Sequence, residues 1–278
     1  MFIQRVKRAI TTFIRDPRGV IQWRIYKIAC PIIRKALQRM PPWHLLYVVN
    51  ISPRYHYVYM DNPKTGCSTL KSALMELELK DADTGLDCLD WRNIHDRSVT
   101  PFLKFNELRS AAPLSRLAKE NYKFITFVRN PYTRLLSCYR DKILKGRRQK
   151  QRILESLGYS QDDMDRPISF EDFVKVVASQ PDIDMDPHWR VQTSHVLYDL
   201  LDYAFVGRFE QYQEDYTRLF EFLGIPVDKI PVVRHLNRTK DGDQECADNH
   251  YTKELQDLVY ERYKADFMNF GYGYELPG

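Results

Sequence analysis

The sequence predicts an α/β protein in which a P-loop-like parallel sheet is flanked by helices, with a helical extension at the N-terminus. Three short apolar runs, at 57–60, 124–128 and 203–207, have the composition and length of buried strands. The first two runs are each followed by a tight loop and the start of a helix, which is the arrangement of a βα unit. With 278 residues, the chain is long enough for one α/β domain of this kind.

The N-terminal segment is basic and is predicted to form short helices. Its apolar residues recur at three- and four-residue spacing, and Pro17 and Pro31 divide the pattern. Residues 1–39 hold ten lysines and arginines and one aspartate, so this segment carries +9 while the rest of the chain carries −4. We therefore expect a basic amphipathic helical extension over 1–53 and the main domain over 54–278. The apolar faces of the extension either pack on that domain or lie on an anionic membrane surface.

The loop after the first strand has the features of an anion-binding loop. It reads Pro63-Lys-Thr-Gly-Cys-Ser-Thr69, and a helix is predicted to follow from about residue 68 to residue 79. Backbone N–H groups at such a helix start point at one spot, and the helix dipole favours an anion there. Gly66 permits the tight turn, and Lys64 adds a mobile positive charge. A Walker-type ATP loop is disfavoured because its lysine directly follows the second glycine, whereas Lys64 precedes the single glycine here.

A second anion-binding loop follows the second strand. Arg129 stands where that strand ends, and Ser137 lies eight residues later in the helix that Pro131 is expected to begin. Eight residues make about two helical turns, so both side chains can face one phosphate. The arginine fork suits a phosphate group and serine adds a hydroxyl, although an arginine in a structural ion pair is the alternative for this motif alone. Two such loops in one chain indicate a ligand with phosphate groups at both ends of a nucleoside.

The remainder of the chain is predicted to be mainly helical. We expect loops and short helices over 81–121, and longer helices over 170–179, 209–223 and 252–269. A strongly basic stretch, 142–152, continues or follows the helix of the second motif. It is either a solvated helix face or a contact for a nucleotide or an acidic glycan.

Composition excludes several classes of protein. No run of eighteen apolar residues is present, so no membrane-spanning helix is expected. The first apolar residues are interleaved with arginines, unlike a signal peptide. The five cysteines are scattered without metal-ligand spacing, which favours free thiols in a reducing compartment and no bound metal. The mildly acidic main domain has no nucleic-acid recognition motif, so we expect no nucleic-acid partner.

These motifs resemble those of the sulfotransferases that use 3'-phosphoadenosine-5'-phosphosulfate (PAPS), and more narrowly the carbohydrate branch that includes the chondroitin and dermatan 4-sulfotransferases. The segment 63–69 is similar to the family's 5'-phosphosulfate loop, and 127–142 is similar to its 3'-phosphate motif. Further similar blocks lie at 186–192, 203–215 and 251–272. The animal Golgi members carry a cysteine pair after the third block and a signal anchor, and both are absent here. These departures favour a bacterial, cytoplasmic member of the family.

The resemblance implies metal-independent, in-line transfer of a sulfuryl group from PAPS to a hydroxyl of a carbohydrate acceptor, either a glycan or a lipid-linked glycan. Lys64 would act at the phosphosulfate bridge, while Arg129 and Ser137 would bind the 3'-phosphate. The implied nucleotide-binding residues are Lys64, Thr65, Gly66, Cys67, Ser68, Thr69, Arg129, Ser137 and Arg238. If the basic extension lies on an anionic membrane surface rather than packing on the main domain, the enzyme would lie peripherally on the inner face of the membrane.

A general base must accept the proton of the acceptor hydroxyl, and histidine suits that role near neutral pH. His95 lies between the two phosphate motifs, where the family and its uronyl-sulfating relatives place a histidine. His188, in the Asp-Pro-His-Trp-Arg block, is the competing candidate.

Two other functions remain open at the level of the sequence. One is a nucleotide-dependent phosphotransferase, which would require ATP and magnesium. The other is a membrane-associated nucleotide-binding module without turnover. The position of Lys64 counts against the first, and the presence of Lys64, Arg129 and Ser137 together counts against the second.

Overall fold

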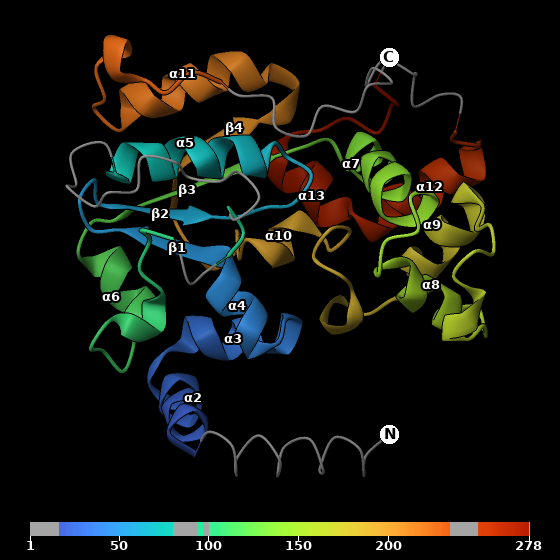
Figure 1. Cartoon of the computed structure of the whole chain (residues 1–278), viewed down its shortest axis with the longest axis horizontal. Helices are drawn as coiled ribbons and strands as arrows, with labels where there is room; N and C mark the ends of the chain where they lie inside the picture. The colour runs from blue at the N-terminus through green and yellow to red at the C-terminus, as the bar shows by residue number, and fades with distance from the viewer. Residues whose placement is uncertain (1–16, 80–93, 97–99, 234–249, 278) are drawn as a thin grey trace.

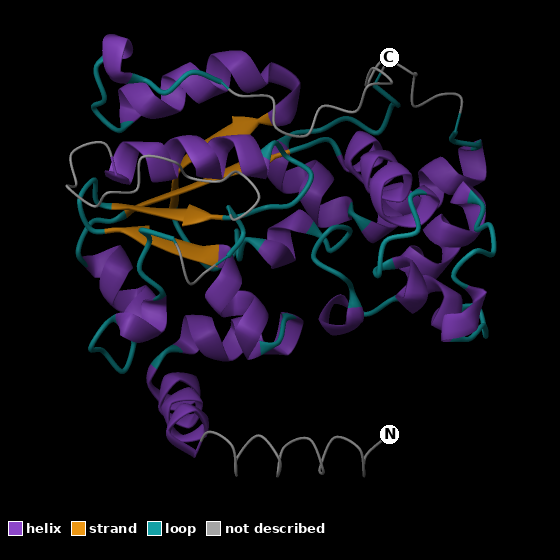
Figure 2. Cartoon of the chain, in the orientation of Figure 1, coloured by secondary structure: helices purple, strands orange, loops and turns teal. Residues whose placement is uncertain are grey.

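The core of the protein is a four-stranded mixed sheet. The structure is a computed structural model that describes residues 17–79, 94–96, 100–233 and 250–277. The strands are β1 (Val49–Ser52), β2 (Tyr57–Met60), β3 (Lys123–Val128) and β4 (Tyr203–Arg208). They lie in the order β1-β2-β3-β4; β2, β3 and β4 run parallel, whereas β1 is antiparallel to β2 (Figures 1 and 2).

Helices cover both faces of this sheet and form a cluster beside it. The described α-helices are α2 (Pro17–Ala29), α3 (Pro31–Arg39), α4 (Pro42–Val48), α5 (Cys67–Leu79), α6 (Pro113–Lys119), α7 (Pro131–Cys138), α8 (Lys150–Ser156), α9 (Phe170–Ser179), α10 (Gln192–His195), α11 (Tyr212–Phe222), α12 (Lys253–Arg262) and α13 (Lys264–Phe270). A π-helical segment spans Tyr139–Leu144, and short 3-10 turns span Phe105–Glu107, Gln161–Asp163, Asp182–Asp184, Phe209–Gln211 and Val227–Lys229.

The alternating direction of the side chains along β2 explains why both faces of the sheet are covered. Tyr57 and Tyr59 are buried against α5 and α11, while Val58 and Met60 are buried in a separate cluster with α2, α3, α4 and α6. Successive side chains of a strand point to opposite faces, so a strand buried on both sides must be apolar throughout. A third cluster joins α7, α8, α9, α12 and α13 beside the sheet (Figure 1).

The predicted fold class is confirmed, with one added strand. The three expected strands and the expected helices after 63–69 and over 170–179 are present. Strand β1 was not predicted, and it comes from the segment that we expected to be a helical extension. It pairs with β2 from Val49↔Met60 to Ser52↔Tyr57. How the chain divides into domains stays a prediction, but the last residues of 1–53 form part of the sheet.

The predicted C-terminal helix over 252–269 is two helices. Tyr263 lies between α12 and α13 with φ −105° and ψ 18°, outside the helical region. The break brings buried Asp266 to the start of α10, where its carboxylate accepts hydrogen bonds from the backbone N–H groups of Gln192 and Thr193 at 2.8 and 2.7 Å.

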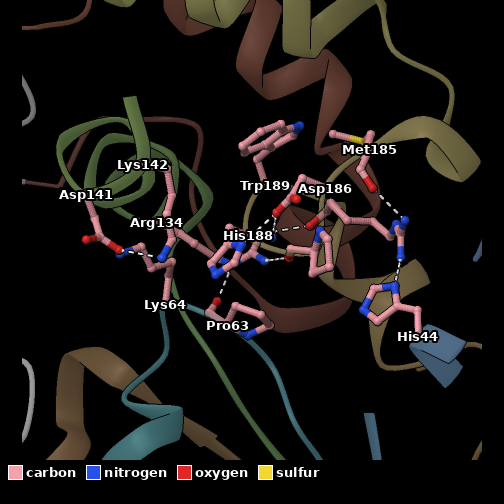
Figure 3. Close-up of polar contacts among 12 residues, drawn as sticks. His44, Pro63, Lys64, Arg134, Asp141, Lys142, Met185, Asp186, His188 and Trp189 are labelled. Carbon is pink, nitrogen blue, oxygen red and sulfur yellow. Dashed lines mark hydrogen bonds and ion pairs between the residues drawn. The ribbon is translucent and has the colours of Figure 1, made fainter. Parts of the chain in front are cut away.

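Two buried histidines are expected to make the fold sensitive to acid. His44 accepts a hydrogen bond at Nδ1 from the Arg190 guanidinium at 2.5 Å (Figure 3). The ring of His44 also lies 4.9 Å from the ring of His195. Burial lowers the pKa of His44 to about 3 and holds the pKa of His195 well below 6.5. Both rings are therefore neutral in the folded protein, whereas the unfolded chain protonates them below about pH 6.5.

We expect the free energy of unfolding to fall as the pH drops from 7.5 to 5. The unfolded state then binds more protons than the folded state, so each buried neutral histidine costs up to about 2 kcal/mol at pH 5. Urea titrations at the two pH values measure this difference. The variant His44→Asn should show a smaller loss between the two pH values than the native sequence. An equal loss in both proteins would show that His44 does not contribute.

Candidate functional site

The two loops that the sequence predicts to bind anions lie next to each other at the carboxyl ends of β2 and β3. The first loop, 61–66, joins β2 to α5, and the second, 129–130, joins β3 to α7. Because β2 and β3 are parallel neighbours, the two loops emerge at the same edge of the sheet. This edge also receives the 186–190 segment, as the contacts in Figure 3 show.

The first loop holds a sharp turn with two residues in the left-handed region. Lys64 has φ +71° and Gly66 has φ +77°. Gly66 is required for a second reason, because a Cβ atom there would lie 2.4 Å from Cε2 of Tyr212. The Tyr212 hydroxyl also donates a hydrogen bond to the Gly66 carbonyl at 3.1 Å. The packing of Tyr212 thus fixes the turn from which α5 begins.

Lys64 is ion-paired to an aspartate of the π-helical segment. Its Nζ lies 2.7 Å from Oδ2 of Asp141, and Lys142 Nζ lies 3.0 Å from the same oxygen (Figure 3). Partial burial would raise the pKa of Asp141, but the two lysines hold this pKa well below its usual range. The carboxylate is therefore ionised and is an anion in contact with the lysine proposed for the phosphosulfate bridge.

The remaining residues of the first loop have different environments. The Thr65 hydroxyl is buried and donates to the Asn62 carbonyl at 2.7 Å, so its side chain stabilises the loop itself. Desolvation raises the pKa of the Cys67 thiol to about 12, so this group is neutral. Ser68 and Thr69 are half-buried in the first turn of α5. This segment thus contributes the start of α5 and the Ser68 hydroxyl to the site.

Arg129 is held on one face of α7. Its Nε donates to Thr133 Oγ1 at 3.0 Å, and its guanidinium carbon lies 4.1 Å from the ring centroid of Phe209. Ser137 is one turn beyond Thr133 in α7, so Thr133 and Ser137 share the helix face that Arg129 contacts. The structure therefore places Arg129 and Ser137 along one face, with Thr133 between them.

A buried amide network fixes the backbone at Arg129. The Gln192 side chain accepts from the Arg129 N–H at 3.0 Å and donates to the Arg129 carbonyl at 2.8 Å. The same Gln192 oxygen accepts from Asn62 Nδ2 at 3.0 Å, and Asn62 also donates to the Phe127 carbonyl. Asn62 belongs to the first loop and Arg129 to the second, so this network sets the spacing between the two loops.

Arg134 joins the two loops to the histidine block. This arginine of α7 is fully buried and donates to the carbonyls of Pro63, Pro187 and Arg190 at 3.0, 3.2 and 2.8 Å (Figure 3). A buried charge of this kind is tolerated because its donors are satisfied by backbone oxygens. Arg134 therefore links three segments that are far apart in the sequence.

His95 lies beside the first loop. Its Nε2 is 3.0 Å from Ser68 Oγ, and its Nδ1 is 2.7 Å from the Tyr47 hydroxyl. The ring of Tyr47 lies 4.8 Å from Nζ of Lys71, which forms a buried ion pair with Asp61 at 3.2 Å. The His95 side chain is exposed, but partial desolvation by its neighbours lowers its pKa below 6.5. The ring is therefore neutral and able to accept a proton at neutral pH.

His188 forms a pair with Asp186. Its Nδ1 lies 2.6 Å from Asp186 Oδ1, and its backbone N–H donates to the same oxygen at 3.1 Å (Figure 3). Burial opposes ionisation of Asp186, but the His188 contacts bring the pKa of this carboxyl below its usual value. An ionised carboxylate can only accept, so Nδ1 of His188 carries the proton and Nε2 is the basic atom. Burial lowers the pKa of His188, and the positive charges of Lys64 and Lys142 add to that effect.

Several functional candidates were not identified from the sequence. They are Tyr47, Thr133, Arg134, Asp141, Asp186 and Gln192. The four-residue spacing of Arg129, Thr133 and Ser137 was visible beforehand. The other contacts join residues that are distant in the sequence. Arg238, by contrast, lies outside the described residues.

The described residues show neither a metal cluster nor a membrane span. Over 17–79, 94–96, 100–233 and 250–277, no group of three or more His, Cys, Asp or Glu side chains is arranged to bind a metal ion. No helix within these same ranges has the length and apolar character needed to cross a bilayer.

Comparison with known proteins identifies the family. The profile of the Sulfotransferase family matches residues 48–273. Curated relatives include carbohydrate sulfotransferase 12 of Mus musculus, 24% identical over 88% of this chain and 64% of its own length. Carbohydrate sulfotransferase 9 of Homo sapiens is 26% identical over 82% of this chain and 54% of its own length. Carbohydrate sulfotransferase 14 of Mus musculus is 29% identical over 82% of this chain and 61% of its own length.

The chain spans less than two thirds of the length of each of these three relatives. No solved structure matches it significantly. The family match begins at residue 48 and therefore includes β1, the two predicted anion-binding loops and the two candidate histidines. Since this match extends over most of the sequence, the chain belongs to the sulfotransferase family.

Proposed function

We propose that this protein transfers a sulfuryl group from PAPS to a hydroxyl group of a carbohydrate, in a reaction that needs no metal ion. The observation that carries the proposal is the pair of anion-binding loops on neighbouring parallel strands, held together by Gln192 and Arg134. Membership of the sulfotransferase family and the names of the relatives support the same reaction. The acceptor is a glycan or a lipid-linked glycan.

The residues present fit a nucleotide with phosphate groups at its 3' and 5' positions. The α5 start, Lys64 and the Ser68 hydroxyl would hold the 5'-phosphosulfate, which supplies the sulfuryl group when bound. Arg129 and Ser137, on one face of α7, would hold the 3'-phosphate. Arg238 stays a further candidate for the nucleotide.

Lys64 and Asp141 would have opposite effects on the nucleotide. In the transfer, the bond between sulfur and the bridging oxygen of the 5'-phosphate breaks, and a bond between sulfur and the acceptor oxygen forms. Lys64 would stabilise the negative charge that develops on the leaving phosphate. Asp141 binds Lys64 in the free protein and would have to release it, so this carboxylate competes with the nucleotide for the lysine.

His95 is the base that the geometry favours over His188. Its Nε2 lies 3.0 Å from Oγ of Ser68, in the first turn of α5 that would hold the phosphosulfate, so His95 is close to where the sulfuryl group would be transferred. In the active tautomer, Nδ1 would donate to the Tyr47 oxygen and Nε2 would take the acceptor proton. The Asp186–His188 pair is the second candidate, because its carboxylate directs the basic nitrogen away from Asp186.

Transfer of label tests the proposed reaction directly. The purified protein is incubated with sulfur-labelled PAPS and a glycan extract in EDTA, and the glycans and nucleotides are separated. We expect label in a glycan and one 3'-phosphoadenosine-5'-phosphate (PAP) for each sulfate transferred. A product formed only from ATP and magnesium would instead support the phosphotransferase, and binding without turnover would support the nucleotide-binding module.

Arg129 should be specific for the 3'-phosphate. We expect Arg129→Ala to weaken PAP binding by about 10- to 100-fold, since it removes a charge-assisted hydrogen-bond donor. Affinity for AMP, which lacks the 3'-phosphate, should be nearly unchanged. Titration calorimetry in EDTA with both ligands measures the two effects. Equal weakening of PAP and AMP would show that Arg129 does not contact the 3'-phosphate.

A further inference from the structure

Helix α2 has two apolar faces, and within the part of the chain that the structure describes only one of them is packed. The inner face carries Trp23 and Tyr26, whose rings lie 5.7 and 5.8 Å from the ring of Phe105. Tyr26 is fully buried in the cluster that includes α3, α4 and one face of the sheet. The packing expected for the N-terminal helices is thus present on this side of α2.

The opposite face of α2 exposes three isoleucines. Ile21, Ile25 and Ile28 have four- and three-residue spacing, which places them on one stripe of the helix. Their exposed fractions are 53%, 41% and 81%. Figure 1 shows α2 at the margin of the molecule, with α3 and α4 between it and the sheet. The stripe is therefore accessible to an external surface.

The surroundings of this stripe are positively charged. Residues 17–48 contain six lysines and arginines and no aspartate or glutamate. Arg39 is paired with Asp199, whereas Arg24 and Lys27 of α2 and Arg34 and Lys35 of the adjoining helix α3 are exposed. The facing segment 106–111 adds Glu107 and Arg109, whose charges cancel. An exposed aliphatic stripe with basic neighbours has the composition of an interfacial helix.

We propose that the α2 face formed by Ile21, Ile25 and Ile28 binds an anionic membrane surface. The isoleucines enter the boundary between headgroups and acyl chains, while the nearby basic side chains contact the lipid phosphates. Association with a second copy through the same face is disfavoured, because it would bring two positively charged surfaces together. The inference concerns a surface outside the candidate active site and does not depend on the proposed reaction.

Vesicle sedimentation with the full chain tests the surface. We expect the protein to sediment with phosphatidylglycerol-containing vesicles at low salt, and about tenfold less at 0.5 M salt or with pure phosphatidylcholine. The variant Ile21→Ser/Ile25→Ser/Ile28→Ser should lower partitioning to anionic vesicles by about tenfold or more. The matched control is Val227→Ser/Val232→Ser. It replaces two apolar residues outside α2 whose side chains are 67% and 81% exposed.

Circular dichroism and sedimentation velocity complete the test. All three proteins should show the same folded spectrum, since the replaced side chains are exposed. Vesicle binding that survives the triple substitution, or equal loss in the control, would overturn the assignment of α2. A dimer of the native protein that the triple substitution dissociates, without any vesicle binding, would assign the face to a second copy and also overturn it.

Discussion

Lys64→Ala is expected to lower kcat by about 10²- to 10³-fold while changing the affinity for PAP by less than about tenfold. The reason is that the ammonium group is needed most when the bond to the bridging oxygen breaks. In the free protein Lys64 is already paired with Asp141 at 2.7 Å, so its contribution to ground-state binding is partly offset by that lost contact. Single-turnover kinetics with saturating PAPS, together with calorimetry on PAP, separate the two effects.

Two further variants make the result for Lys64 specific. Lys145→Ala removes the same charge from an exposed position of the basic stretch and should keep near-native kcat. Asp141→Asn should tighten PAP binding, because it removes the anion that competes for Lys64. Native kcat in Lys64→Ala would contradict the assigned role. Weaker PAP binding in Asp141→Asn would contradict the competition.

His95→Ala is expected to lower kcat by about 10²- to 10⁴-fold and to leave PAP binding intact, because a general base contacts the acceptor. His56→Asn is the matched control, since His56 is exposed and stacks on Tyr122. An active His95→Ala protein together with an inactive His188→Ala protein would transfer the role to the Asp186–His188 pair.

The pH dependence gives an independent test of His95. The base must be neutral, so kcat/KM should rise with pH through an apparent pKa below 6.5 and level off above it, in agreement with the lowered pKa of His95. Tyr47→Phe keeps the ring over Lys71 but removes the partner of Nδ1, so it should displace this profile while PAP affinity is retained. An unchanged profile in Tyr47→Phe would show that the hydroxyl does not position His95.

The fold could be predicted where local patterns are strong. The strands near 57–60, 124–128 and 203–207 are short apolar runs beside turn signals, and the structure contains all three. Strand β1 is only four residues long and directly follows α4, so periodicity alone does not distinguish it from the end of a helix. Its extended conformation is selected by pairing with β2, which is a tertiary contact. The break at Tyr263 likewise accompanies a tertiary contact, because Asp266 of α13 accepts a hydrogen bond at the start of α10.

The site could be predicted where its residues belong to local sequence motifs. Lys64 and Arg129 lie in local motifs whose residue types already indicate phosphate binding. The Lys64–Asp141 contact spans 77 residues and the Arg134–Pro63 contact spans 71, so neither leaves a local signal. Tyr47 belongs to the segment that the sequence assigned to the helical extension, and only the folded chain brings it to His95.

The most direct test of the two-loop site is a crystal structure of the protein with PAP. We expect the 5'-phosphate within hydrogen-bonding distance of the 64–69 backbone and Lys64, and the 3'-phosphate on Arg129 and Ser137. Lys64 should then have left Asp141. A 3'-phosphate bound away from α7, or a 5'-phosphate away from the first loop with Lys64 still on Asp141, would contradict the proposed site.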